Sequence, residues 1–280
     1  MRELNLKLKN LYFKYPATDK FAIDGIDLEI KKGERLAVLG ENGMGKSTLF
    51  FLSNGVYEPT EGDIFLNDRK LTRSKKDLME LRKSVGLVFQ DPETQFIAPT
   101  VEEEISFGPI NLGLTTSEVQ EVVDEVIKTL DIERLRRKSL YALSGGEKKL
   151  VSIASVLALS PDIIIFDEPT SGLDYSNTQI YKSVLKKLYD KGLGLVMSIH
   201  DINFAWEWAD RVVILNHGKI IADGSAVEIL SNEEILKKAN LEKPDLVKFF
   251  ELLQIEGENY PRSFEELKNK IDGNKRDLVK

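Results

Sequence analysis

The sequence of 280 residues contains no cysteine and only two histidines, His200 and His217. The lack of cysteine excludes disulfide bonds, thiolate metal sites and a cysteine nucleophile, and it suits a reducing cytosol. No apolar run, such as Ile163–Phe166, is long enough to cross a bilayer, so any role at a membrane requires a partner. The charged and apolar residues of Met1–Asn5 do not form a signal peptide. The net charge of −7 argues against a nucleic-acid-binding protein.

Two hydrophobic patterns predict two kinds of β-strand. Apolar residues alternate with polar ones from Leu4 to Leu8, from Ile26 to Ile30 and from Ile64 to Leu66, which is typical of antiparallel strands with one wet face. Continuous apolar runs instead predict buried strands of a parallel sheet. These runs are Leu36–Leu39, Val85–Phe89, Ile163–Phe166, Leu195–Ile199 and Val212–Leu215.

Helical segments are predicted between and after these runs. Apolar residues recur at helical spacing over Ser117–Leu130, with Ser117 as the expected N-cap. Two further helices are expected at Glu228–Ala239 and Asp245–Leu253. Asn216–Gly218, which includes His217, is predicted to form a hairpin turn, so we interpret that histidine as structural.

The segment from Gly40 to Thr48 fits the phosphate-binding P-loop pattern of Gly, four residues and Gly-Lys-Ser/Thr, between a predicted strand and a predicted helix. Glycines there let backbone N–H groups turn onto phosphate oxygens. We expect Lys46 to reach the β- and γ-phosphates and Ser47 to ligate Mg²⁺. This context makes an ordinary glycine-rich turn a poor alternative. The residues predicted to bind ATP are Gly40, Asn42, Gly43, Gly45, Lys46, Ser47 and Thr48.

Two adjacent acids, Asp167 and Glu168, follow the buried run Ile163–Phe166. In α/β sheets, ligands bind at the carboxyl ends of the strands. We therefore expect Asp167 to hold Mg²⁺ and Glu168 to polarise the attacking water as general base. The alternative is a solvated strand end at which one of the acids caps the next helix.

A second phosphate-binding helix start is predicted at Ser144-Gly145-Gly146, before the apolar helix Leu150–Leu159. One chain does not need two such sites for one nucleotide. Two chains facing head to tail would use both, with each P-loop opposite the partner's Ser-Gly-Gly. The alternative is an ordinary N-cap with a tight turn.

With these motifs in this order, residues 1–235 resemble an ATP-binding-cassette (ABC) ATPase. The resemblance implies a RecA-like α/β P-loop core with an antiparallel β subdomain and an α-helical subdomain at about 92–155. It also implies that Gln90 binds Mg²⁺ and senses the γ-phosphate, that His200 contacts that phosphate and positions Glu168, and that Asp174 lies at a dimer interface. Tyr15 matches the aromatic residue that stacks on adenine, although Tyr12 and Phe13 are close enough to compete.

A narrower resemblance lies in Val88–Pro109, which is similar to the ATPase component of energy-coupling-factor importers, including the cobalt and nickel systems. It implies a second ATPase subunit, identical or paralogous, and integral-membrane subunits at the cytoplasmic face of the cell membrane. The segment after Gln90 would receive a helix of the membrane subunit. Residues 236–280 are compatible with a C-terminal helical extension. Glu147 and Tyr175 depart mildly from the family pattern.

Some alternatives remain open at the level of sequence. The chain could serve another class of ABC transporter, or it could be a non-transport ABC ATPase. The interval from Gln90 to Ser144 is too short for the coiled coil of DNA-repair members, and the chain has one cassette where translation members have two. Ile105, Phe107, Ile110, Leu112 and Leu114 are expected either to pack the helical subdomain or to form part of a docking groove.

Overall fold

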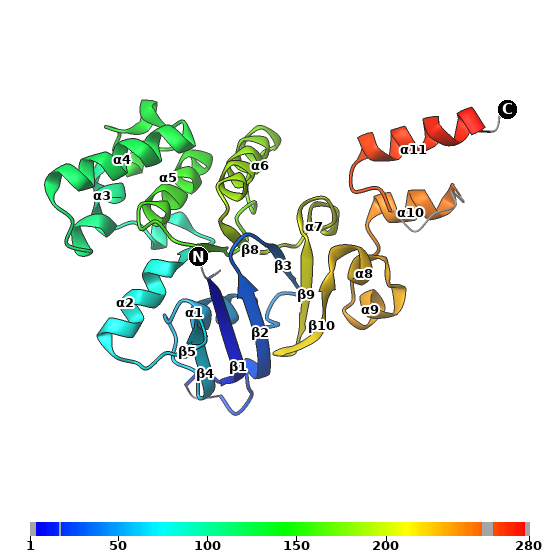
Figure 1. Cartoon of the computed structure of the whole chain (residues 1–280), viewed down its shortest axis with the longest axis horizontal. Coiled ribbons are helices and arrows are strands. Elements are labelled where there is room, and N and C mark those ends of the chain that lie inside the picture. Colours follow the sequence, from blue (N-terminus) through cyan, green and yellow to red (C-terminus); the bar gives the residue numbers. More distant parts are fainter. Residues whose placement is uncertain (1–3, 17, 254–259, 278–280) are drawn as a thin grey trace.

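The computed structural model describes residues 4–16, 18–253 and 260–277, and Figure 1 shows the arrangement of their elements. Two β-sheets form the centre of the molecule. Helices α3 (Val101–Asn111), α4 (Thr116–Leu130) and α5 (Gly145–Leu157) lie on one side of them. Helices α10 (Asp245–Leu252) and α11 (Phe264–Asp277) lie on the opposite side, beyond α7 (Ile202–Trp208) and α8 (Ala226–Ser231) (Figure 1). In the described part of the chain, no helix combines the length and apolar character needed to span a bilayer.

The first sheet has four strands in the order β2-β1-β4-β5, and its pairs are antiparallel. The alternation seen in the sequence explains its burial, because Leu6 and Leu8 on the central strand are almost fully buried while Lys9 is exposed. The strands are β1 (Asn5–Phe13), β2 (Ile23–Lys31), β4 (Glu61–Leu66) and β5 (Arg69–Lys70).

The second sheet has six strands in the order β10-β9-β3-β8-β7-β6. All its pairs are parallel except the β9–β10 hairpin, where His217 and Gly218 adopt positive φ in the predicted turn. Every residue of β7 is buried, as a parallel strand covered on both faces requires. The strands are β3 (Arg35–Leu39), β6 (Val85–Val88), β7 (Ile163–Phe166), β8 (Gly194–Ser198), β9 (Arg211–Asn216) and β10 (Lys219–Ser225).

Helices fill the interval between β6 and β7, as the sequence predicts. The prediction that Ser117 is the N-cap is wrong. Thr115 caps α4, and its pairing with Glu118 completes a capping box. The elements are 3₁₀ helices η1 (Pro92–Thr94), η2 (Glu133–Leu135) and η3 (Leu140–Ala142), and helices α3 (Val101–Asn111), α4 (Thr116–Leu130) and α5 (Gly145–Leu157). Elsewhere in the first 200 residues lie α1 (Lys46–Ser53), α2 (Lys75–Ser84) and α6 (Tyr175–Asp190).

The predicted helix Glu228–Ala239 is two helices, because Asn232 breaks it and caps the second one. Apolar residues of α10, including Val247 and Phe250, are buried in the same hydrophobic cluster as Leu230. The helices of this part are α7 (Ile202–Trp208), α8 (Ala226–Ser231), α9 (Glu233–Lys238), α10 (Asp245–Leu252) and α11 (Phe264–Asp277). The division into residues 1–235 and an extension from 236 stays a prediction.

Candidate nucleotide-hydrolysis site

The candidate site lies where the parallel strands of the second sheet end. The P-loop follows β3, Gln90 comes two residues after β6, the Asp167–Glu168 pair follows β7, and His200 comes two residues after β8. Because β3, β8, β7 and β6 are adjacent and parallel, their carboxyl ends share one edge of the sheet. Segments that are up to 160 residues apart in sequence, from Gly40 to His200, therefore meet there.

Two glycines of the P-loop are required by its backbone path. Gly40 has φ 144°, and a Cβ built there would lie 2.4 Å from the carbonyl oxygen of Leu215 on β9. Gly45 has φ 104°, and its Cβ would lie 2.6 Å from the carbonyl oxygen of Ala22. Any larger residue would push the loop off the sheet, so the sequence pattern has a direct steric cause here.

The ammonium group of Lys46 is folded back onto its own loop. Its Nζ donates to the carbonyl oxygens of Gly40 at 2.8 Å and Glu41 at 3.0 Å, and the residue is 5% exposed. Burial lowers the pKa of Lys46, although the charges of Glu168 and Asp167 partly oppose that shift. The P-loop lysine and both acids therefore lie within electrostatic reach of one another.

Asp167 and Glu168 are fixed by a buried serine that the sequence reasoning missed. Ser198, the last residue of β8, donates its hydroxyl to Asp167 Oδ1 at 2.8 Å and accepts the Glu168 backbone N–H at 2.7 Å. Glu168 itself adopts φ 43°, in the left-handed region that costs a non-glycine residue about 1–2 kcal/mol. Because of this turn, the carboxylate of Asp167 points to Ser198, while that of Glu168 points to Gln90 and His200.

The Glu168 carboxylate bridges two other predicted site residues. Gln90 donates from Nε2 to Glu168 Oε2 at 2.7 Å, and His200 Nε2 lies 2.5 Å from Glu168 Oε1. The Glu168 side chain is 17% exposed and the His200 side chain 44%. The predicted base is thus shielded but open on one side, with an amide and an imidazole holding its orientation.

Among the competing aromatic residues, Tyr15 is placed best to face a nucleotide. It is 38% exposed, and its hydroxyl lies 2.8 Å from Oγ1 of Thr48 in the first turn of α1. Phe13 is 8% exposed and stacks on Tyr57. The Tyr12 ring packs against Phe21, with its hydroxyl over Gly25.

The Ser144–Gly146 segment begins α5, as predicted. Ser144 caps the helix, and the Glu147 carboxylate completes a capping box by accepting the Ser144 N–H at 2.9 Å. That hydrogen bond, together with Arg134, lowers the pKa of Glu147 to about 2, so the residue is ionised at neutral pH. Within the described residues, no hydrogen bond joins Ser144–Gly146 to the P-loop.

The start of α5 is instead connected to the segment that follows Glu168. Lys149 donates from Nζ to the carbonyl oxygens of Pro169 at 2.8 Å and Ser171 at 2.6 Å. Asn177 lies where a Cβ on Gly146 would clash, and it donates to the carboxylate of Asp174, the N-cap of α6. Sequence reasoning missed Lys149, which directly follows Glu147 and Lys148 at the start of the helix and precedes its apolar part.

Comparison with known proteins agrees with this geometry. The model of the family described as ABC transporter matches residues 23–171, more than half of the chain. The chain belongs to the ABC transporter family. It is an ATPase of that family with the RecA-like P-loop fold, and the predicted fold class is confirmed.

Relatives of this ABC ATPase are similar over most of their length. The energy-coupling factor transporter ATP-binding protein EcfA of Methanocaldococcus jannaschii is 42% identical over 248 residues, which are 89% of this chain and 88% of that protein. A putative ABC transporter ATP-binding protein of Methanosarcina acetivorans is 45% identical over 90% of this chain and 77% of its own.

Solved structures show the same likeness in three dimensions. The structure of cbiO1 from Clostridium perfringens, described as part of the ABC transporter complex cbiONQ, has a TM-score of 0.74 and 36% identity, covering 89% of this chain and 98% of that one. The cassette MJ0796, dimeric and bound to ADP and Pi, has a TM-score of 0.69 and 29% identity, covering 79% and 98%.

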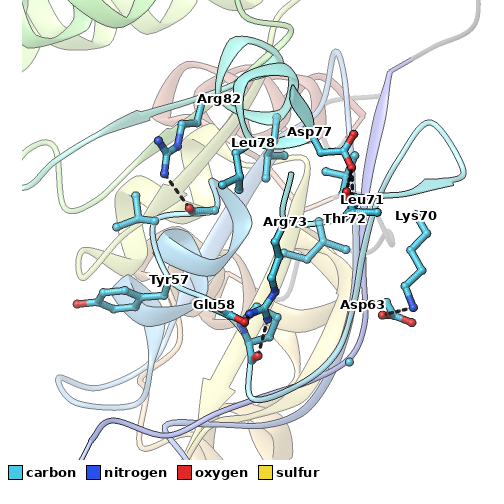
Figure 2. A pocket seen from close by; sticks show the side chains of 16 residues that line it. Tyr57, Glu58, Asp63, Lys70, Leu71, Thr72, Arg73, Asp77, Leu78 and Arg82 are labelled. Atoms are coloured by element: carbon cyan, nitrogen blue, oxygen red, sulfur yellow. Dashed lines mark hydrogen bonds and ion pairs between the residues drawn. The ribbon is translucent and has the colours of Figure 1, made fainter. Parts of the chain in front are cut away.

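This ABC ATPase also has a cavity of about 640 Å³ between α2, β4, β5 and the loop after α1 (Figure 2). None of the predicted nucleotide-site residues lines it. Its charged side chains already have protein partners, as in the pair Lys70–Asp63 and the hydrogen bond from Arg82 to the Gly55 carbonyl. We therefore assign no ligand to it.

Ser198 gives a prediction for this site. Ser198→Ala leaves the Asp167 carboxylate and the Glu168 N–H without their hydroxyl partner, so we expect the free energy of unfolding to fall by about 1–3 kcal/mol and ATP hydrolysis to slow. Denaturant unfolding and steady-state ATPase assays measure both effects. Ser152→Ala is the matched control, because this buried hydroxyl bonds only a carbonyl within α5. Equal ATPase rates in the two variants would contradict a role for Ser198 at the site.

Proposed function

We propose that this chain is the ATP-hydrolysing subunit of an energy-coupling-factor importer for a metal ion such as cobalt or nickel, or for a vitamin. It would work as a peripheral protein at the cytoplasmic face of the cell membrane. The carrying observation is the Gln90–Glu168–His200 cluster at the strand ends beside the P-loop. Likeness to proteins named EcfA and cbiO1 supports the importer type.

In this proposal Glu168 takes a proton from the water that attacks the γ-phosphate. His200 orients Glu168 and contacts that phosphate, while Lys46 leaves the carbonyls of Gly40 and Glu41 to bind the β- and γ-phosphates. Tyr15 stacks on the adenine.

Mg²⁺ fits the donors that these strand ends supply. Within the described residues there is no group of three or more His, Cys, Asp or Glu side chains able to hold a metal. Mg²⁺ in nucleotide sites needs only a few protein oxygens, since phosphate and water complete its octahedron. The Ser47 hydroxyl, the Gln90 amide oxygen and the Asp167 carboxylate are such donors, and the ion would neutralise phosphate charge.

A second ATPase subunit, identical or paralogous, would complete each site. Ser144 and Gly145 are exposed and Gly146 is half-buried at a helix start with a fixed capping box. Within the described residues, no hydrogen bond joins them to the P-loop of their own chain. If the two chains face each other head to tail, the Ser144–Gly146 segment of one would lie opposite the P-loop of the other. Asp174, tied to the same helix start through Asn177, would then lie at the interface.

The membrane subunits would dock near the loop that precedes α3. The carboxylate of Glu104, only 4% exposed, accepts the backbone N–H groups of Ile97 and Ala98 at 2.9 Å each. Ile97 is 68% exposed and Tyr141 is 90% exposed, and both line a hollow of about 180 Å³. Exposed apolar side chains around a hollow are typical of helix recognition.

The apolar residues of this region divide between the two expected roles. Ile105 is fully buried and packs in the core, and Leu114 is partly buried against it. Phe107 and Ile110 are 41% and 59% exposed, and Leu112 is intermediate. Gln95 accepts the backbone N–H of Phe89, the neighbour of Gln90, at 3.2 Å and donates to the Ser152 carbonyl of α5 at 2.8 Å. Movement at Gln90 can therefore reach the hollow.

The catalytic role is tested by Glu168→Gln, which keeps shape and hydrogen bonding but removes the base. We expect ATP binding to persist, hydrolysis to slow by roughly 10²-fold or more, and an ATP-bound dimer to accumulate. Nucleotide-binding titration, single-turnover hydrolysis and size-exclusion chromatography measure the three effects. Near-normal turnover would rule out Glu168 as the base.

The docking role is tested by Ile97→Asp. A charge at this exposed position should abolish uptake in cells that also contain the membrane subunits, while ATP hydrolysis by the isolated protein stays within about twofold, because Ile97 touches no predicted catalytic group. Met79→Glu is the matched control, since Met79 is 45% exposed on α2, outside the hollow. Normal uptake by the Ile97 variant, or loss of uptake in both variants, would contradict docking at this loop.

A further inference from the structure

The short helix α7 connects the proposed catalytic histidine to the C-terminal part of the chain. α7 begins at Ile202, two residues after His200, and Asp201 caps it by accepting the N–H groups of Asn203 and Phe204. It has only seven residues, too few to be stable without tertiary contacts. The position of His200 therefore depends on β8 on one side and on whatever holds α7 on the other.

The first turn of α7 is held by the start of α10. The Asn203 side chain donates from Nδ2 to Asp245 Oδ2 at 3.0 Å and accepts the Asp245 backbone N–H at 2.7 Å. This reciprocal pair joins residues 42 positions apart. It also provides the N–H of the first α10 residue with an acceptor, which the end of a helix otherwise lacks.

The last turn of α7 is held by the residues that precede α11. The Arg262 guanidinium donates to the carbonyl oxygens of Trp206, at 2.6 Å, and Ala209, two acceptors at a helix end that no intrahelical N–H satisfies. The Arg262 Cζ atom lies 5.3 Å from the centroid of the Trp206 ring, within cation–π range. The Trp206 indole, fully buried, donates to the Pro261 carbonyl at 2.8 Å.

We propose that the start of α10 at Asp245, together with Pro261 and Arg262 before α11, positions His200 for ATP hydrolysis by holding α7 at both of its ends. Arg262 and the Asn203–Asp245 pair are positioning residues, since they touch the helix that follows His200 and not His200 itself. The inference rests on the proposed catalytic role of the Glu168–His200 pair. It gives the C-terminal part a function within its own subunit.

The test is Arg262→Ala in the full-length chain, with steady-state ATPase kinetics and ATP-binding titration. A misplaced imidazole should lower kcat by about tenfold or more and leave the Kd for ATP within about twofold, because a shift of about 1 Å at a catalytic group is enough for such a loss. Arg262→Lys should recover part of the rate, since an ammonium can still donate to one of the two carbonyls.

Lys243→Ala is the matched control. Lys243 is also a cation of the C-terminal part, but its ion pairs are with Glu251 and Glu233, and it does not touch α7. It should hydrolyse ATP at the wild-type rate. Asp245→Ala is a second probe that does not endanger folding, because that side chain is 57% exposed, and it should lower kcat in the same direction.

Combination with His200→Ala decides whether Arg262 acts through the histidine. If it does, Arg262→Ala slows the wild type but slows the His200→Ala protein no further. If the double variant instead loses kcat by the product of the two single losses, the proposal is overturned. A normal rate for Arg262→Ala would also overturn it. Loss of the ATP-trapped dimer when Arg262→Ala is added to Glu168→Gln would also overturn it, because the defect would then be in dimerisation.

The same set of variants separates this inference from the proposed function. A normal rate for His200→Ala would contradict the catalytic role of His200, and the inference would fail with it. If His200→Ala slows ATP hydrolysis but Arg262→Ala does not, the proposed function stands. Only the inference that the C-terminal part positions His200 through α7 would then be overturned.

Discussion

The site depends most on how the carboxylate of Glu168 is held at the carboxyl edge of the parallel sheet. Gln90 and His200 each bind one of its oxygens, while Ser198 holds its backbone N–H and the neighbouring Asp167. These groups come from three adjacent strands, so their geometry exists only when β6, β7 and β8 pair in register. The left-handed backbone of Glu168 is stabilised by those partners, and a strained conformation of this kind is characteristic of functional sites.

Much of the fold and the site is predictable from the sequence, because each has a local cause. Buried parallel strands need continuous apolar runs, as in Ile163–Phe166, and a backbone that turns onto phosphates needs glycine, as at Gly40 and Gly45. The residues that follow such strands must then meet at one edge. The family resemblance, and not this argument, pointed to Gln90 and His200. The structure places both beside Glu168, although they lie 78 and 32 residues away from it in sequence.

What the sequence could not predict depends on contacts without a local signal. Ser198 looks like any small residue at a strand end, and Lys149 looks like a helix-surface cation until α5 packs beside Pro169. Thr115 and Ser117 are both possible N-caps of α4. Glu118, three residues after Thr115, favours Thr115 because it completes a capping box. The partners of Arg262 are backbone carbonyls more than 50 residues away, which no sequence pattern encodes.

In the shared site that we propose, each ATP is hydrolysed between the P-loop and Glu168 of one chain and Ser144–Gly146 of another. To test it, a Lys46→Ala chain is mixed with a Ser144→Arg chain. ATP hydrolysis by the mixture is measured, and cross-linking shows how much heterodimer has formed. In such a heterodimer one site carries both defects and the other carries neither, so activity should rise well above that of either variant alone. No recovery of activity, with heterodimers demonstrably formed, would contradict the shared site.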